Sequence, residues 1–414
     1  MKQFLIKYNY HLLLILIGLF WISVFDFLTQ MSSQGIIYPD STSYQESAKN
    51  LYVFYRGHNY RPILMAIING FPYLFGSSDS TIYVVGFYVN LVCWLATFLI
   101  LFEILKQFSK PKVAFFFSAF SIFFIGNTAF VFHLLTENIY VFFIVSGFYF
   151  LMKYYKEKSF WQLSASLGIF ILSMLIKPGS KFLAIVFLLF FIKEIYKNYA
   201  SKCAWFIYGS LFLVFVQCTG LKYQFGNFTL SYIDSVTYYN YVGTKAMNYK
   251  TGKEFVQMNN PRAEYIFSNE CSIQREIAKT DLFNQLQFNT INLIKAYIDD
   301  GIENTKTGNI CVDDCKNVKN STYFQFWKPL LFAISKWQNW IFTTLGFCLS
   351  VFYFFRSYNS ERLYCFVSFF VLYTFFLSGI SCGQGDRFHV ITFPFVLLLL
   401  AKFIFERTTL KPIN

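Results

Sequence analysis

The sequence is poor in charge. Only 14% of its 414 residues are Asp, Glu, Lys or Arg, whereas a soluble domain carries about 25%. Hydrophobic residues make up 56% of the chain and occur in long apolar runs. This composition excludes an ordinary soluble domain and indicates an all-α, polytopic integral membrane protein.

Other features are missing as well. No internal repeat and no low-complexity linker divides the chain. No small-residue cleavage site follows the first apolar run, because Phe25–Leu28 is bulky, so we interpret that run as a retained helix rather than a signal peptide. No histidine accompanies Cys271, Cys311 and Cys315. A zinc site there is disfavoured, and a disulfide among these cysteines is the alternative, with its pairing open.

Ten apolar runs are candidates for membrane spans, since a span needs roughly 20 mostly apolar residues. They cover 11–29, 81–105, 113–132, 134–152, 160–176, 180–196, 203–221, 329–355, 363–381 and 388–405. We therefore predict a bundle of about ten transmembrane helices. Residues 1–221 form an N-terminal membrane module, 222–328 an extracytoplasmic segment and 329–414 the C-terminal helices.

The net charge of +13 follows this topology. Successive crossings place the basic residues of the turns on one side: Lys2, Lys7, Lys106, Lys110, Lys112, Lys153, Lys156, Lys158, Lys193, Lys197, Lys202, Arg356, Arg362, Lys402, Arg407 and Lys411. The short turn at 132–137 on the other side has no Lys or Arg. Both termini are therefore predicted to be cytoplasmic, in a bacterial inner or plasma membrane, and no nucleic-acid partner is expected.

The first predicted outer loop, 30–80, contains two helical patterns. Ser41 or Asp40 can cap a helix, and Tyr44, Ala48, Leu51 and Tyr52 then lie on one face at helical spacing. The apolar stretch 63–75 is too short to span a membrane. We predict that both are interfacial helices lying on the membrane surface.

The second outer segment, 222–328, is more irregular. Only 283–302 shows clear helical periodicity. The periodic residues are Leu286, Ile291, Ile294, Tyr297 and Ile298. We predict a helix there and loops in most of the rest.

Ionisable residues gather at the predicted outer face, where groups at membrane depth are costly and tend to mark function. They are Asp40, His58, Arg61, His133, Glu137, Lys177, Lys181, Asp386, Arg387 and His389. Each has a structural reading too: Lys181 could snorkel and Glu137 could cap a helix. Lys177 and Arg387 run against the charge rule for outer turns, which favours an anionic ligand.

This set fits displacement at a sugar anomeric carbon with a lipid phosphate as leaving group. Asp40 would be the base for the acceptor hydroxyl. Lys177, Arg387 and Arg61 would neutralise the phosphate. The lipid tail would need a groove between helices.

Short motifs in the same order resemble the GT-C glycosyltransferases. Pro39-Asp40-Ser41, with Tyr44, Ala48 and then Arg61-Pro62 opening an apolar run, is similar to the first periplasmic loop of protein O-mannosyltransferases and lipid A aminoarabinose transferases. Further matches are Leu135–Asn138, Leu175–Pro178 and Gly385–His389 with Pro394. Two departures are Ser41, where many members have a second acid, and the lack of a large soluble C-terminal domain.

The resemblance implies a GT-C-like bundle and a polyprenyl-phosphate sugar as donor, with a glycan, lipid or protein as acceptor. It makes Asp40 the catalytic base, with Glu137 as a second candidate catalytic carboxylate. Tyr44, His58 and His389 are expected to contact the substrate. No cofactor is expected, no metal site is predicted, and a divalent metal has no support in the sequence.

Two other functions remain open. A polysaccharide polymerase or ligase acting on lipid-pyrophosphate glycans would rely on basic residues of the large loop, such as Arg262 and Arg275, but would leave the Asp40 motif unexplained. A transporter of a lipid-linked substrate would show inverted repeats or broken, charged span centres. Neither pattern is visible in this sequence.

Overall fold

The computed structural model describes residues 2–31, 39–256, 260–315, 318–357 and 361–409. Lys411 of the basic C-terminal tail lies outside these ranges, as do parts of both predicted outer segments. Within the described residues every regular element is a helix, which confirms the all-α prediction.

The helices of the first half follow the predicted apolar runs and the first polar loop. They are α1 (Lys2–Thr29), α2 (Pro39–Tyr52), α3 (Ile63–Gly70), η1 (Phe71–Phe75), α4 (Asp79–Leu105), α5 (Pro111–Ile122), α6 (Ile125–Ala129), η2 (Phe130–Phe132), α7 (Glu137–Glu157), α8 (Phe160–Ser173), η3 (Pro178–Ser180), α9 (Lys181–Phe190), α10 (Ile192–Lys197), η4 (Lys202–Ala204) and α11 (Trp205–Phe225). The two helical patterns of the loop 30–80 are therefore helices α2 and α3.

The second half begins with six helices in the polar segment and ends with long apolar ones. They are α12 (Ile233–Asn240), α13 (Val242–Thr251), α14 (Pro261–Phe267), α15 (Cys271–Phe288), α16 (Thr290–Lys306), α17 (Ile310–Asp313), α18 (Ser321–Arg356), α19 (Arg362–Ser378), η5 (Gly385–Phe388), η6 (Val390–Thr392) and α20 (Phe393–Thr409). The single helix predicted at 283–302 is two helices. They part at Asn289, whose φ of −147° is not helical and whose side chain donates to the Ala246 carbonyl.

Several helices of the described chain are long and apolar enough to cross a membrane. Four qualify: Tyr8–Thr29, Asp79–Leu105, Lys202–Phe225 and Gly385–Phe405. A fifth arises if Pro111–Ile122 and Ile125–Phe132, which meet at 62°, count as one bent span. The predicted spans 160–176 and 180–196 are shorter helices, since α8 has 14 residues and α9 has 10. The predicted spans 134–152 and 329–355 fall on α7 and α18, which are long but are not among the qualifying helices. The structure thus supports a membrane protein, and the count of ten spans stays a prediction.

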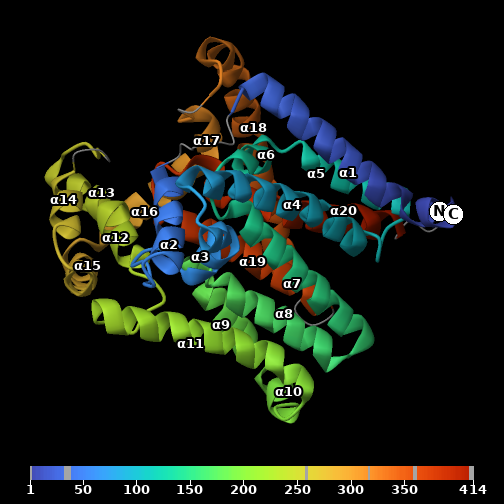
Figure 1. The fold of residues 1–414 in the computed structure, drawn as a ribbon, viewed down its shortest axis with the longest axis horizontal. Helices are drawn as coiled ribbons and strands as arrows, with labels where there is room; N and C mark the ends of the chain where they lie inside the picture. Colours follow the sequence, from blue (N-terminus) through green and yellow to red (C-terminus); the bar gives the residue numbers. More distant parts are fainter. Residues whose placement is uncertain (1, 32–38, 257–259, 316–317, 358–360, 410–414) are drawn as a thin grey trace.

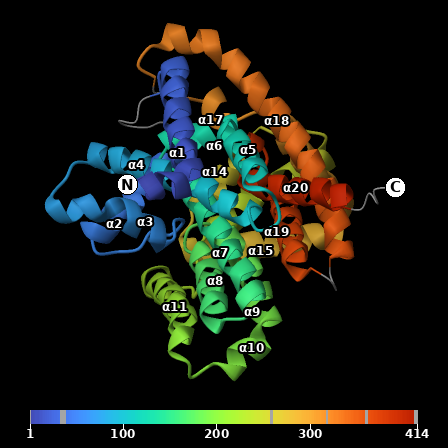
Figure 2. The same cartoon turned by 90° about the vertical axis from the view of Figure 1, so that its right-hand side faces the viewer.

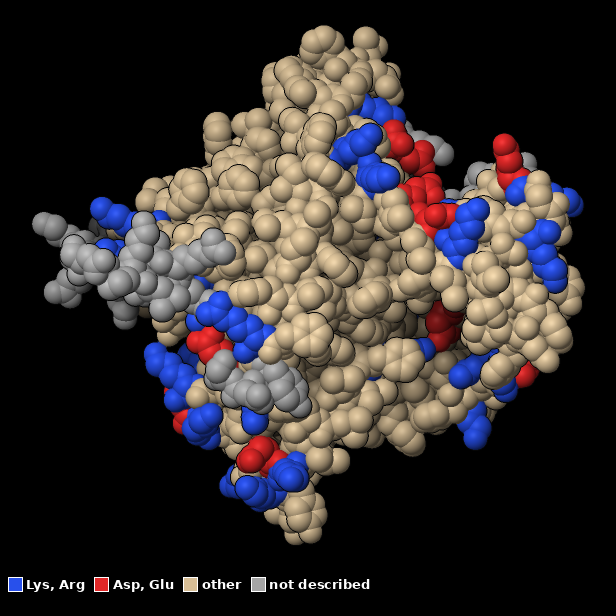
Figure 3. Space-filling model, turned by 180° about the vertical axis from the view of Figure 1, so that it is seen from behind, with Lys and Arg blue, Asp and Glu red and all other residues tan. Residues whose placement is uncertain are grey.

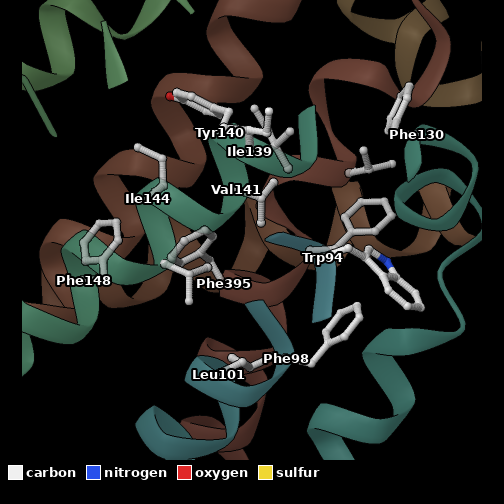
Figure 4. Close-up of a cluster of buried hydrophobic side chains, with 14 of the residues drawn as sticks. Trp94, Phe98, Leu101, Phe130, Ile139, Tyr140, Val141, Ile144, Phe148 and Phe395 are labelled. Atoms are coloured by element: carbon white, nitrogen blue, oxygen red, sulfur yellow. The ribbon is translucent and has the colours of Figure 1, made fainter. Parts of the chain in front are cut away.

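The core lies where α4, α7 and α20 meet (Figure 4). Trp94 and Phe98 of α4, Ile144 and Phe148 of α7, and Phe395 of α20 are all buried here, and the Phe395 ring lies beside Phe148. The Phe148 and Phe395 ring centroids are 5.2 Å apart. This core fixes the start of α7 relative to the turn before α20, and both carry residues of the site described below.

The polar helices gather at one end of the molecule. In Figure 1, α12 to α16 lie at the left, while the free ends of α1 and α20 lie at the right. Figure 2 shows α1 and α18 on the upper side, with α10 and α11 on the lower side. In Figure 3, charged side chains collect toward two sides of the molecule and a broad uncharged surface separates them.

Helix α2 packs closely on α3. A Cβ added at Gly70 would come within 2.8 Å of both the Ala48 Cβ and the Tyr52 ring, so only glycine allows this approach. Of the face predicted from the sequence, Tyr44 and Ala48 are buried and Leu51 and Tyr52 are partly buried. The first polar loop is therefore a packed helical pair that holds Asp40 at the start of α2.

Candidate active site

Five ionisable residues from distant parts of the chain meet at one place. Asp40 comes from α2, Arg61 from the turn before α3, Glu137 from the start of α7, Lys177 from the turn after α8 and Arg387 from η5. We call these five residues the charge cluster. All five had been predicted as site residues from the sequence.

Arg387 joins the two carboxylates of the charge cluster. Its Nη1 donates to Asp40 Oδ2 at 2.5 Å, and its Nε donates to Glu137 Oε1 at 2.6 Å. Arg61 Nη2 reaches the other Asp40 oxygen at 2.7 Å. Lys177 Nζ lies 3.0 Å from Glu137 Oε1. Each carboxylate therefore has two cationic partners, and removal of one cation leaves it still paired.

The turn before α3 fixes Arg61. His58 Nδ1 accepts hydrogen bonds from the backbone N–H groups of Tyr60 and Arg61, at 3.1 and 3.2 Å. The Arg61 guanidinium lies 4.4 Å from the centre of the Tyr44 ring, and its Nε donates to Ser43 Oγ at 2.7 Å. The guanidinium is thus held on both its face and its edge, directed at Asp40.

Lys177 owes its place to the proline that follows it. A residue before proline is disfavoured in the helical region, and Lys177 is extended, with φ −124° and ψ 107°. Helix α8 has ended at Ser173, and the extended Lys177 turns its side chain toward α7. Its ammonium lies 5.8 Å from the centre of the Tyr140 ring and 5.5 Å from that of Phe388. The surrounding rings shield it from water.

Arg387 belongs to a turn that is held by the buried amide side chain of Asn304. Asn304 Nδ2 donates to the carbonyls of Ser378 and Ser381, and its Oδ1 accepts from the Gln384 N–H at 3.1 Å. Gly385 has a φ of +54°, the left-handed region that glycine favours. These hydrogen bonds hold the turn in the conformation that directs Arg387 into the charge cluster.

The charge cluster has three cations and two carboxylates, so its formal charge is +1 when all five are ionised. Burial raises the pKa of Asp40, but attraction from Arg387 and Arg61 outweighs this and holds the pKa well below its usual range. Burial lowers the pKa of Lys177, an effect that Glu137 opposes and Arg387 adds to. Asp40 is therefore ionised at neutral pH, and the surplus positive charge has room for an anion.

The charge cluster opens into a cavity of about 910 Å³. Asp40, Arg61, Lys177 and Arg387 line its polar end. Most of its wall is apolar and comes from α12, α13, α15, α16 and α19. Ile233, Val242, Leu282, Leu293, Ile294 and Leu377 are among these lining residues. One cavity thus joins a cationic end to a large apolar wall.

Three further residues had been predicted to contact the substrate. Tyr44 lines the cavity, beneath Arg61. His58 supports the Arg61 turn instead and does not appear among the described lining residues. His389 is buried, with Nδ1 3.1 Å from Asn339 Oδ1 and Nε2 3.0 Å from Ser378 Oγ. The structure therefore brings Tyr44 to the cavity and gives the two histidines structural partners.

Other candidates lie apart from the charge cluster. Lys181 pairs with Asp234 at 2.6 Å at the edge of the cavity. Arg262 pairs with Asp281 at 2.9 Å and lies over the Tyr239 ring. Arg262 and Arg275 are both missing from the described cavity lining. The cavity is therefore lined by the Asp40 motif and not by the two arginines of the large loop that a polymerase or ligase would use.

The cysteines are free thiols. This holds for all nine, including Cys271, Cys311 and Cys315, so the expected disulfide is not formed. Cys311 is buried, and Cys271 accepts from Asn59 Nδ2 at 3.2 Å. Among the described residues, no group of three or more His, Cys, Asp or Glu side chains is placed to hold a metal ion.

The sequence reasoning missed the neutral residues that position the charges. Ser43 accepts from Arg61, and Gln384 Oε1 accepts from Arg387 Nη1 at 3.4 Å. Spacing was the signal that could have found them, because each lies three residues from a predicted site residue, Asp40 or Arg387. Tyr140, which faces Lys177, was missed because it lies inside an apolar run.

Comparisons with known proteins add no relative. No protein-family model matches the chain, and no curated protein matches it significantly. The resemblance to GT-C glycosyltransferases therefore stays a prediction that rests on the short motifs.

Proposed function

We propose that the chain is an integral membrane glycosyltransferase of the GT-C type. It transfers a sugar from a polyprenyl-phosphate donor to an acceptor on the extracytoplasmic side of the membrane. The observation that carries this proposal is the cavity that joins three cations and the Asp40 carboxylate to a large apolar wall. A lipid-linked phosphate has the same two parts, a charged head and an apolar tail.

The cations suit the leaving group of this reaction. When the bond between the anomeric carbon and the phosphate oxygen breaks, the polyprenyl phosphate gains negative charge. Arg387, Arg61 and Lys177 lie where they can stabilise that charge, and their burial keeps water from screening it. The guanidinium groups also offer the paired donors that phosphate oxygens accept.

Asp40 suits the role of base because it shares the same arginines. With no donor bound, Arg61 and Arg387 keep it a weak base. A phosphate that takes hydrogen bonds from these arginines loosens their hold on Asp40 and raises its basicity. The acceptor oxygen then bonds to the anomeric carbon, its proton passes to Asp40, and the polyprenyl phosphate departs.

The proposed topology follows from the placement of charge. The apolar helices are read as ten spans, including the shorter α8 and α9. The basic turns and both termini lie in the cytoplasm, and the charge cluster lies at the opposite end. The apolar wall of the cavity then lies next to the membrane, from which the lipid tail of the donor can enter.

Polyprenyl phosphate itself is the sharpest test, because it is the leaving group whichever sugar is transferred. Polyprenyl phosphate and polyprenol are added separately to the full chain in lipid nanodiscs, and binding is measured by native mass spectrometry. The phosphate is expected to bind at least a hundredfold more tightly than the alcohol. Lys177→Ala and Arg387→Ala should each reduce that preference by roughly 10- to 100-fold, since a charge-assisted hydrogen bond contributes about 1.5–3 kcal/mol.

Both variants should still fold, because each carboxylate keeps one cation. Lys49→Ala is the matched control, since Lys49 pairs with Asp79 on the surface at 3.1 Å and does not line the cavity. It should bind as the wild type does. Equal binding of polyprenyl phosphate and polyprenol by the wild-type chain would rule out the proposed function.

A further inference from the structure

Helix α16 buries two polar side chains and exposes a row of apolar ones. Asp300 and Asn304 are fully buried, while Ile291, Ile294 and Ile298 are 83%, 53% and 50% exposed. Ile302 continues the same line one turn further and is 46% exposed. We call these four isoleucines the α16 stripe. A helix in water turns its apolar residues to the protein. Helix α16 buries Leu293 and Ala296 in this way, yet it leaves all four isoleucines of the stripe uncovered.

The two buried polar side chains of α16 are bonded to other parts of the protein. Asp300 Oδ1 accepts from Lys245 Nζ at 2.6 Å, and Asn304 Nδ2 donates to the carbonyls of Ser378 and Ser381 at 2.9 and 2.7 Å. These bonds fix the rotation of the helix about its own axis. The stripe therefore cannot turn inward without leaving a buried carboxylate and a buried amide unpaired.

The α16 stripe continues an apolar surface of the membrane helices. A second cavity, of about 530 Å³, lies between α16, α18 and α19. Ile298 and Ile302 line it together with Trp340, Phe347 and Phe376. These three aromatic residues are themselves between 45% and 59% exposed. The uncovered side of α16 and that of the apolar bundle thus form one surface.

We propose that the α16 stripe is embedded in the hydrocarbon of the membrane, so that α16 lies in the outer leaflet rather than in the aqueous space. Lys295 and Lys306 are exposed beside the stripe, where their ammonium groups can reach lipid phosphates. The occupant is the bilayer itself. Part of the segment 222–328 is then a membrane element, and this holds whether or not the chain transfers sugars.

The test uses the full chain in lipid nanodiscs with dansylalanine at one position. Position Ile298 probes the stripe. Val92, 65% exposed on α4, gives the lipid-facing reference, and Lys279, 60% exposed on α15, gives the water-facing one. Each labelled chain should melt within a few degrees of the wild type, since all three positions are exposed. Quenching is measured with lipids brominated in their chains and, separately, with iodide in the buffer.

At Ile298 we expect strong quenching by brominated lipid, within twofold of that at Val92, and weak quenching by iodide. The reverse pattern, matching Lys279, would overturn the proposal because the stripe would face water. Weak quenching by both agents would also overturn it, since the stripe would then be covered by protein, such as a second copy of the chain.

Discussion

Asp40 is the residue whose role is most open to test. Both of its carboxylate oxygens accept hydrogen bonds from arginines, so its side chain faces the cavity while its backbone begins α2. Asp40→Asn keeps the size of the side chain and removes its basicity. If Asp40 is the base, turnover should fall by roughly 10²–10⁴-fold, the contribution typical of a positioned acid or base. Sugar transfer by the variant, with a polyprenyl-phosphate sugar as donor, measures this.

Binding separates loss of basicity from damage to the site. Asp40→Asn raises the formal charge of the charge cluster from +1 to +2, so polyprenyl phosphate should bind the variant at least as tightly as the wild type. Asn begins a helix about as well as Asp does. Near-normal sugar transfer by the variant would make Asp40 a structural residue and would direct the search for the base to Glu46 and Glu137.

The identities of the site residues could be predicted from the sequence, but their partners could not. Lys177 and Arg387 stood out because each is ionisable and borders an apolar run, and Asp40 stood out because it lies where a helix of the first outer loop can begin. Their pairing depends on the tertiary structure, since Arg387 and its partner Glu137 are 250 positions apart. His389, two residues beyond Arg387, was predicted to contact the substrate, yet the turn directs it toward Asn339. Spacing in the sequence does not show which way such a turn faces.

The turn before α3 is an element whose stability depends on pH. His58 Nδ1 must be unprotonated to accept from the N–H groups of Tyr60 and Arg61. Burial, with repulsion from Arg61 and Arg56, lowers the pKa of His58 from 6.5 to about 4. Since the folded state then binds fewer protons than the unfolded state, stability should fall as the pH drops below about 6.5, by roughly 2 kcal/mol at pH 5.

Melting temperatures in detergent at pH 7.5 and pH 5 check this prediction. His58→Asn is the matched control, because its amide oxygen can accept the same hydrogen bonds and does not titrate. The wild type should lose several degrees more than the variant between the two pH values. Glu46 is the nearest acid, 4.0 Å from His58 Nε2, and it is too exposed to offset the loss. An equal loss in both proteins would assign the pH effect to other groups.

The positions of the helices were easier to predict from the sequence than whether a given helix face meets protein or lipid. The periodicity at 283–302 predicted a helical segment, and α15 and α16 are found there. Periodicity gives the direction of an apolar face, but the same pattern suits a protein core and a lipid surface. For α16, the pairing of Asp300 with Lys245 identifies which face is inside, and that contact joins positions 55 residues apart.

At the scale of the whole molecule, charge is divided between two ends. The turns with Lys110, Lys158 and Lys202 carry the basic surplus, and the charge cluster lies with α2 and α12 to α16 at the other end (Figures 1 and 3). The separation was predictable, because the sign and position of charges follow directly from the sequence. The number of spans was harder to predict, because two bent helices such as α5 and α6 have the same apolar sequence pattern as one straight span.

The topology predicts which ends an impermeant thiol reagent can reach in intact cells. Lys156 is exposed in the last turn of α7, on the proposed cytoplasmic side, and Ser268 is exposed after α14 on the opposite side. Ser268→Cys should be labelled in intact cells, whereas Lys156→Cys should be labelled only after the membrane is opened. Ser43 in the first loop is a poorer site, since it is half-buried and holds Arg61. The wild-type chain is the control for its own cysteines, of which Cys348 is exposed.

The two positions distinguish topology from accessibility, because both must react once the membrane is open. Labelling of Lys156→Cys in intact cells would mean that the proposed topology is inverted and that the charge cluster faces the cytoplasm. A donor linked to a lipid on the outer leaflet could not reach it there, so the extracytoplasmic reaction would have to be abandoned. The α16 stripe would still lie against lipid, since that inference depends on which face of the helix is buried and not on which side of the membrane α16 occupies.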